Sequence, residues 1–180
     1  MISHYINLEE AHLRRKALEH NFAACRTDSR TLRRFAAIAA SSDRVQLTPG
    51  RLRNEEKACF LSHRDLLRQL AGQPNPLHIL EDDALLGHET FETIDRCLSL
   101  LDPDQWDLMF TDVLIPGLPE MIALLSRRRS LVAAGHVEFL DLSTMNFAAA
   151  TSYIVNPRSV ARVLQLLDQH LQLDLAYDLA

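Results

Sequence analysis

Three acidic residues stand side by side after a short hydrophobic run in the segment PLHILEDDALLGHE, residues 76–89. The run at 77–80 has the pattern of a buried strand, and Glu81, Asp82 and Asp83 follow it with no basic residue between them. Adjacent carboxylates repel one another, and burying them without a partner is costly, so we expect a positive group beside them. Carboxylate oxygens are the ligands that Mg²⁺ and Mn²⁺ prefer, and these ions bridge phosphate oxygens. The segment therefore predicts a cation site for a diphosphate.

The position and spacing of these acids favour a shared ion. Ligands of open α/β sheets bind beyond the carboxyl ends of the strands. An acid-x-acid spacing at a strand end lets the first and third side chains point the same way, so we expect Glu81 and Asp83 to share the cation. Asp82 would then face elsewhere or contact a sugar or ribose hydroxyl. The alternative is that the acids only cap the following helix, although three in a row exceed what a cap needs.

A second cluster of polar residues lies in EEKACFLSHRDLLRQL, residues 55–70. On a helix, His63 falls three residues after Phe60 and four before Leu67, so it shares their apolar face. Neighbouring helix residues point about 100° apart, so Ser62 and His63 cannot form a nucleophile and base by adjacency, and a hydrolase triad is poorly supported. From the residues alone we interpret Ser62 as hydrogen-bonded to its own helix and His63 as a core histidine with satisfied hydrogen bonds.

Alternating elements must position these residues. Strand patterns are predicted at 2–8, 33–41, 77–80, 106–115, 131–142 and 148–156. Helices are predicted at about 9–24, 54–71, 89–101 and 119–129, with a last helix that begins at Asn156 and Pro157 and extends to Leu171; residues 41–54 read as a loop. We expect the strands at 77–80 and 106–115 to be buried. Strands that alternate with helices predict an α/β sheet sandwich.

The composition predicts one ordinary globular domain over residues 1–180, since the chain is 47% hydrophobic. Its net charge of −5 gives no general attraction to nucleic acid or anionic membranes, so any phosphate binding must come from local groups. The cysteines, at Cys25, Cys59 and Cys97, are odd in number and widely spaced. We interpret them as buried thiols in a reducing compartment rather than as a disulfide framework or a zinc site.

The sequence predicts a cytoplasmic protein. Residues 1–15 contain too few apolar residues for a signal peptide, and no apolar run approaches the ~20 residues that span a bilayer. Contact with the inner face of the cytoplasmic membrane stays open, because the run at 127–129 is three arginines. A solvated helix end is the favoured interpretation of that run.

Five segments together resemble glycosyltransferase family 25, of the lipopolysaccharide-biosynthesis type. The family typically carries YVINLDRRPDRR, GEIGCFLSH, LILEDDA, a late AYLIS..GA..LL segment and a PID step. The matching segments of this chain are YINLEEAHLRR, EEKACFLSH, LHILEDDALL, TSYIVNPRSVARVL and QLDLAYD, which occur in the same order and spacing over most of the chain.

The resemblance implies a GT-A-like fold, with a mixed, mainly parallel sheet and helices on both faces. It implies an enzyme that moves a hexose, commonly galactose, from a UDP-sugar to a lipopolysaccharide, lipooligosaccharide or other surface glycan. The implied transfer is inverting and assisted by Mn²⁺ or Mg²⁺. The implied partners are therefore the UDP-sugar donor and a glycan or glycolipid acceptor, with no nucleic acid and no transmembrane segment.

The resemblance also assigns residues. Asn7 and Leu8 would lie at the end of the first strand against the nucleotide, and Arg15 would approach the diphosphate. The metal ligands would be Glu81 and Asp83. The remaining residues expected in the nucleotide-sugar site are Asp82, Ser62 and His63. The last two belong to the segment EEKACFLSH, here called the signature helix, and no chemical step is assigned to them.

The general base is left between two candidates. The family's late aspartate aligns best with Asp174, whereas Asp112 is a geometric candidate at the end of the strand at 106–115. Asp178 lies four residues after Asp174 and is interpreted as a solvated surface acid.

The chain also departs from the family pattern. The glycines of GEIGC are replaced by Glu55 and Ala58, Glu9 stands at an aspartate position, and family members usually continue beyond the point that corresponds to Ala180. The alternative function is therefore a truncated, catalytically inactive GT-A-like domain that binds a nucleotide or a partner. A metal-dependent phosphohydrolase ranks last, because no nucleophile motif is present.

Overall fold

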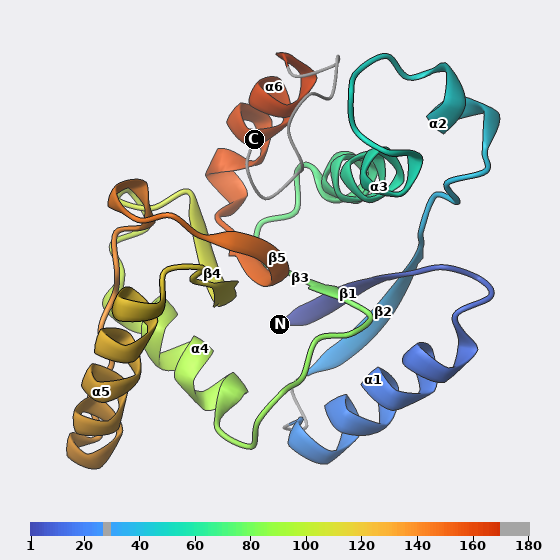
Figure 1. Ribbon diagram of the computed structural model, residues 1–180. Helices are drawn as coiled ribbons and strands as arrows, with labels where there is room; N and C mark the ends of the chain where they lie inside the picture. Colours follow the sequence, from blue (N-terminus) through green and yellow to red (C-terminus); the bar gives the residue numbers. More distant parts are fainter. Residues whose placement is uncertain (27–29, 170–180) are drawn as a thin grey trace.

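The computed structural model describes residues 1–26 and 30–169, which form one five-stranded sheet flanked by helices (Figure 1). The strands lie in the order β2-β1-β3-β5-β4. Their bounds are β1 Ile2–Asn7, β2 Thr31–Ala36, β3 Leu77–Glu81, β4 Leu108–Leu114 and β5 Ala148–Val155. The helices are α1 His12–Cys25, α2 Asp43–Leu47, α3 Asn54–Leu70, α4 Thr90–Leu100, α5 Leu118–Ala134 and α6 Val160–Gln169, with 3-10 turns at Leu142–Thr144 and Pro157–Ser159.

The directions of the strands decide which strand ends meet. β1 pairs in parallel with β2 on one side and with β3 on the other, whereas β5 runs antiparallel to both β3 and β4. Ile6 of β1 is in register with Glu81 of β3, so the carboxyl ends of these two strands lie side by side. The predicted α/β class with a mixed, mainly parallel sheet is confirmed.

Helices cover both faces of this sheet, as predicted, with α1 and α4 on one face and α3 and α6 on the other (Figure 1). Each face has its own hydrophobic cluster, because the side chains of a strand alternate between the two faces. The helical members include Leu18 and Phe22 of α1 with Phe91 and Ile94 of α4 in one cluster, and Phe60, Leu66 and Leu67 of α3 with Val160, Val163 and Leu167 of α6 in the other.

Strand β3 sends its last residues to opposite faces in the same alternation. Leu77 and Ile79 pack in the cluster under α3 and α6, whereas Leu80 packs in the cluster under α1 and α4. The next residues continue the pattern, so Glu81 faces α3 and Asp82 faces α1. The alternation of one strand therefore separates two adjacent carboxylates.

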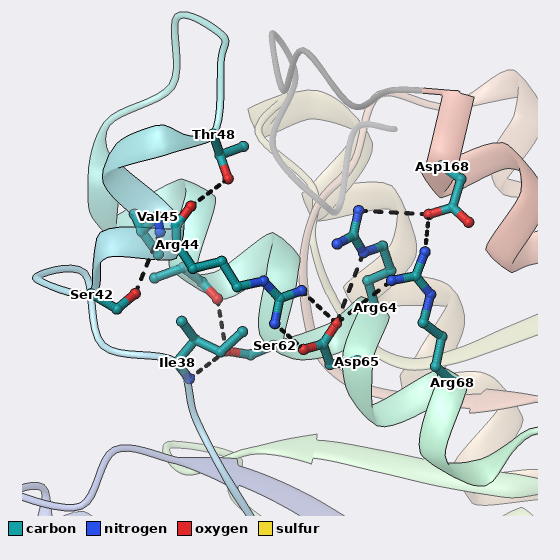
Figure 2. A network of polar contacts seen from close by, with 11 residues as sticks. Ile38, Ser42, Arg44, Val45, Thr48, Ser62, Arg64, Asp65, Arg68 and Asp168 are labelled. Carbon is teal, nitrogen blue, oxygen red and sulfur yellow. Dashed lines mark hydrogen bonds and ion pairs between the residues drawn. The ribbon is translucent and has the colours of Figure 1, made fainter.

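Ion pairs join α3 to its neighbours α2 and α6 (Figure 2). Arg44 of α2 pairs with Asp65 of α3, while Arg64 and Arg68 of α3 lie 3.6 and 2.5 Å from a carboxylate oxygen of Asp168 on α6. Arg64 is buried, and its burial together with the charge of Arg68 lowers its pKa, which the charge of Asp168 opposes. The network links α3, which carries the segment EEKACFLSH, to the helices on either side of it.

The predicted strand at 131–142 is wrong. Its first residues complete α5, which ends before Gly135, and a 3-10 turn lies at Leu142–Thr144. Gly135 has φ +64°, a left-handed conformation that ends a helix and that glycine adopts without steric cost. The arginines at 127–129 therefore lie within α5 rather than at its end. No helix in residues 1–26 and 30–169 is long and apolar enough to cross a membrane.

Two further predictions need correction. The predicted loop at 41–54 contains the short helix α2, whose first turn is capped by the Ser42 side chain as it accepts a hydrogen bond from the Val45 amide. β4 is the edge strand next to β5, and all of its residues are exposed or half-buried rather than buried as expected. The hydrophobic residues of β4 have the pattern of a central strand. The sheet order shows that β4 has a strand neighbour on one edge alone among the described residues.

Candidate functional site

The acidic segment forms a turn at the carboxyl end of β3. Glu81 is the last residue of the strand, and the Ala84 amide donates a hydrogen bond to its carbonyl oxygen over 3.2 Å, which closes a turn around Asp82 and Asp83. Because β3 lies between β1 and β5, the turn is surrounded by β1, α1 and α3. Each carboxylate meets a different environment.

Glu81 faces the buried imidazole of His63. His63 Nε2 lies 3.2 Å from a carboxylate oxygen of Glu81, and Nδ1 lies 2.8 Å from the hydroxyl of Tyr153 on β5. The Cys59 thiol donates to the same oxygen of Glu81 over 3.8 Å. The hydrogen bond from His63 lowers the pKa of Glu81, although partial burial opposes this shift. Glu81 is therefore held as a carboxylate at the floor of the site.

Asp82 points to the other face and is paired there. Asn7 Nδ2 donates to a carboxylate oxygen of Asp82 over 2.6 Å, and Arg14 Nε lies 3.2 Å from the other oxygen. Only 8% of the Asp82 side chain is exposed, whereas the Arg14 side chain is 53% exposed. The positive group expected beside the acids is thus Arg14, and its exposed part remains accessible to a ligand.

Asp83 is the exposed member of the turn. Partial desolvation of its carboxyl group and the charge of Glu81 raise its pKa. The two carboxylates expected to share a cation therefore lie close enough to repel each other, and a divalent ion bound between them would relieve that repulsion. Their oxygen donors fit Mg²⁺ or Mn²⁺.

The end of β1 holds the adjoining residues in place. The Asn7 carboxamide oxygen accepts a hydrogen bond from Arg34 Nε over 3.0 Å, so Asn7 joins β2 to the acidic turn. Leu8, which follows β1, is half-buried. The structure places the Arg15 guanidinium 3.0 Å from the carbonyl oxygen of Glu9 and within 3.4 Å of the Glu9 carboxylate, where it holds the start of α1.

The interpretation of the signature helix as structural is confirmed for Ser62. Its hydroxyl donates to the Ala58 carbonyl oxygen over 2.7 Å and accepts from the Ile38 amide over 2.9 Å (Figure 2). Ser62 is buried, and so is His63. His63 is a core histidine as expected, but its second ring nitrogen faces the acidic turn.

Of the two candidates for the general base, Asp112 lies among the described residues and Asp174 does not. Asp112 of β4 is in register with Ser152 of β5, which in turn is in register with Leu80 of β3, so Asp112 lies about 10 Å from Leu80 across two strand spacings. Asp112 is exposed. Asp174 and Asp178 lie outside the described residues, as does Leu171 of the predicted last helix.

Sequence reasoning missed two residues beside the acids. Helix periodicity could have placed Arg14 on the sheet-facing side of α1, because it lies four residues before the buried residue Leu18. Cys59 was predicted to be a buried thiol, but it is exposed, whereas Cys97 is buried and Cys25 is intermediate. The overlooked signal was its spacing of four residues before His63, which places both on one side of α3.

We predict opposite stability effects for the two proposed metal ligands. Asp83→Asn should raise the free energy of unfolding at pH 7, because a carboxyl with a raised pKa destabilises the folded state when ionised. The gain should fade as the pH falls toward the ordinary aspartate pKa of 3.8. Glu81→Gln should lower the free energy of unfolding by about 1 kcal/mol at pH 7.

Urea unfolding of both variants from pH 4 to 7 tests this pair of effects. Asp104→Asn is the matched control, because Asp104 is 82% exposed and pairs only at the surface with Arg158. It should change the free energy of unfolding little at any pH. Destabilisation by Asp83→Asn at pH 7 would contradict the repulsion between Asp83 and Glu81.

Comparison with known proteins adds the family. A model of glycosyltransferase family 25, described as LPS biosynthesis protein, matches residues 1–179. No curated protein sequence matches the chain significantly. The mixed, mainly parallel sheet with helices on both faces is consistent with a GT-A-like glycosyltransferase fold. Because the family match covers essentially the whole chain, the protein belongs to glycosyltransferase family 25.

Proposed function

We propose that this glycosyltransferase moves a hexose, with galactose as the first candidate, from a UDP-sugar to a lipopolysaccharide or related surface glycan with inversion. The observation that carries the proposal is the acidic turn after β3, where Glu81 and Asp83 repel each other at the carboxyl end of a parallel strand. Such strand ends are where α/β sheets bind ligands. The family match supports glycosyl transfer and leaves the donor to be tested.

The residues of the turn and the neighbouring Arg14 would have different roles in donor binding. Glu81 and Asp83 would hold Mn²⁺ or Mg²⁺, which would neutralise the charge that develops on the diphosphate leaving group. Asp82 is occupied by Asn7 and Arg14, so its main contribution is to hold β1 and α1 against the turn. Arg14 has the exposed guanidinium nearest to these acids in the ion pairs described, and we assign it to a phosphate oxygen.

The acceptor hydroxyl needs a base, and Asp112 is the candidate among the described residues. It lies on the same sheet as Glu81, two strands away and near the same level, with its side chain exposed to an incoming acceptor. In-line displacement requires the base on the side of the sugar opposite the leaving group.

Titration calorimetry of UDP tests the donor site. We expect UDP to bind in the presence of Mn²⁺ and far more weakly without it, because the cation offsets the charge of both the diphosphate and the acids. Asp83→Asn should lose the Mn²⁺-dependent part of the binding, and Asp104→Asn should retain it. Equal UDP binding with and without Mn²⁺, or no UDP binding by the unmodified protein, would refute the metal-diphosphate proposal.

The neighbouring arginines of α1 should differ in effect. Arg14→Ala should weaken UDP binding about tenfold, the value of one hydrogen bond to a charged group. Arg15→Ala should lower the melting temperature, because Arg15 holds Glu9 at the start of α1, with little change in the dissociation constant of UDP. The same titration and a thermal melt give both quantities. A larger loss of UDP affinity in Arg15→Ala than in Arg14→Ala would assign the diphosphate contact to Arg15 instead.

Asp112→Asn should slow the chemical step without weakening donor binding. We expect the turnover number for sugar release from the UDP-sugar to fall about 100-fold, the usual contribution of a general base, while the dissociation constant of UDP stays unchanged. Asp104→Asn again serves as the control. Full turnover in Asp112→Asn would exclude Asp112 and leave Asp174 as the candidate.

A further inference from the structure

The proposed donor site uses Glu81 of β3 but not the two side chains of α3 that converge on it. Cys59 and His63 lie four residues apart on one side of α3, opposite Glu81 at the end of β3. Among the described residues, these three offer a thiol sulfur, a ring nitrogen and a carboxylate oxygen that all lie within 4.8 Å of one another. Such a combination is a donor set for a metal ion.

Two of the three separations are close to those of a tetrahedral site. Zinc binds nitrogen and oxygen at about 2.0–2.1 Å and sulfur at about 2.3 Å, so tetrahedral angles put nitrogen and oxygen about 3.3 Å apart and sulfur and oxygen about 3.6 Å apart. The observed distances are 3.2 Å from His63 Nε2 to Glu81 Oε1 and 3.8 Å from Cys59 Sγ to the same oxygen. The thiol sulfur and the ring nitrogen lie within 4.8 Å of each other, so an ion that bound all three side chains would draw these two atoms to about 3.6 Å.

A hydrogen bond on the far side of the His63 ring orients the nitrogen that would bind the metal. His63 Nδ1 lies 2.8 Å from the Tyr153 hydroxyl, and both side chains are fully buried. A ring held by a hydrogen bond through one nitrogen presents the other in a fixed direction, which is the usual arrangement of histidine ligands. Access to the cluster comes from the other side, where Cys59 is exposed and the Glu81 side chain is 33% exposed.

The kinds of donor atom select the kind of metal. One sulfur, one imidazole and one carboxylate suit Zn²⁺ and related ions such as Co²⁺ and Cd²⁺, whereas Mg²⁺ and Mn²⁺ prefer oxygen. The wide spacing of the cysteines argues against a structural zinc site built from several of them, but it does not bear on a site with one thiolate. Three protein ligands leave the fourth position for water or an added molecule.

We propose that Cys59, His63 and Glu81 form a binding site for a thiophilic divalent cation of the zinc class. On binding, the sulfur–metal bond replaces the S–H bond of Cys59, and the thiol proton passes to the solvent. Glu81 would then be withdrawn from the cation shared with Asp83, so zinc would antagonise donor binding. That consequence rests on the proposed function, whereas the metal site itself does not.

Cobalt is the probe for this site, because Co²⁺ replaces Zn²⁺ and absorbs visible light. Titration of the full chain with Co²⁺ should give the intense visible bands of tetrahedral coordination and a near-ultraviolet thiolate charge-transfer band, and Zn²⁺ should displace both. Cys59→Ser should remove the charge-transfer band and weaken Co²⁺ binding at least about tenfold. Cys25→Ser is the matched control and should change neither. A thiolate band that persists in Cys59→Ser would overturn the proposal.

A second measurement needs no variant. Zn²⁺ should slow alkylation of the exposed Cys59 by iodoacetamide, followed by mass spectrometry, with Cys25 as the internal reference. No protection and no charge-transfer band in the unmodified protein would mean that the three side chains only hydrogen-bond to one another. Asp83→Asn separates the two proposals, because it should keep the Co²⁺ spectrum while it loses Mn²⁺-dependent UDP binding.

Discussion

The site depends on the compensation of two of the three adjacent carboxylates at the end of one buried strand. The alternation of β3 sends Glu81 toward α3 and Asp82 toward α1, and each meets its own partner there. Those partners belong to elements far away in sequence, so their contacts also fix α1, β1 and α3 relative to the sheet. Asp83 has no comparable share in these contacts, and its partial desolvation together with the charge of Glu81 raises its pKa. The free-energy cost of that arrangement is concentrated at the position where a ligand would relieve it, which is characteristic of functional sites.

His63 illustrates that structural and functional interpretations of one residue can both hold. Its ring is buried and hydrogen-bonded to Tyr153, as a core histidine should be. The same burial keeps water from competing for Nε2, so the nitrogen is available to Glu81 with a defined direction. The rigidity that packing gives to the ring is what would make it useful to a ligand.

Much of the fold could be predicted from the sequence, because β1, α3 and β3 have hydrophobic patterns that match their final environments. The errors have physical causes. Residues 131–142 are rich in residues that suit strands, yet the first of them continue α5 to its glycine cap. β4 looks like a buried strand, but its place at the sheet edge follows from pairing with β5. At the site, the acids were identified from their position after a strand, whereas the contact of Asp82 with Arg14 joins distant segments and needed the structure.

The late insertion of β5 has a consequence for the newly made chain. β5 is the last described strand in sequence, but it lies between β3 and β4 and pairs with both. As the chain leaves the ribosome, β1, β2 and β3 can pair first and leave one edge of β3 open until residue 148 and beyond have emerged. β4 also has no strand to pair with until β5 has emerged, because β5 is its described strand partner. During this interval the open edge of β3 is a surface on which a strand of another nascent chain can pair, so slow synthesis would prolong the exposure of that edge.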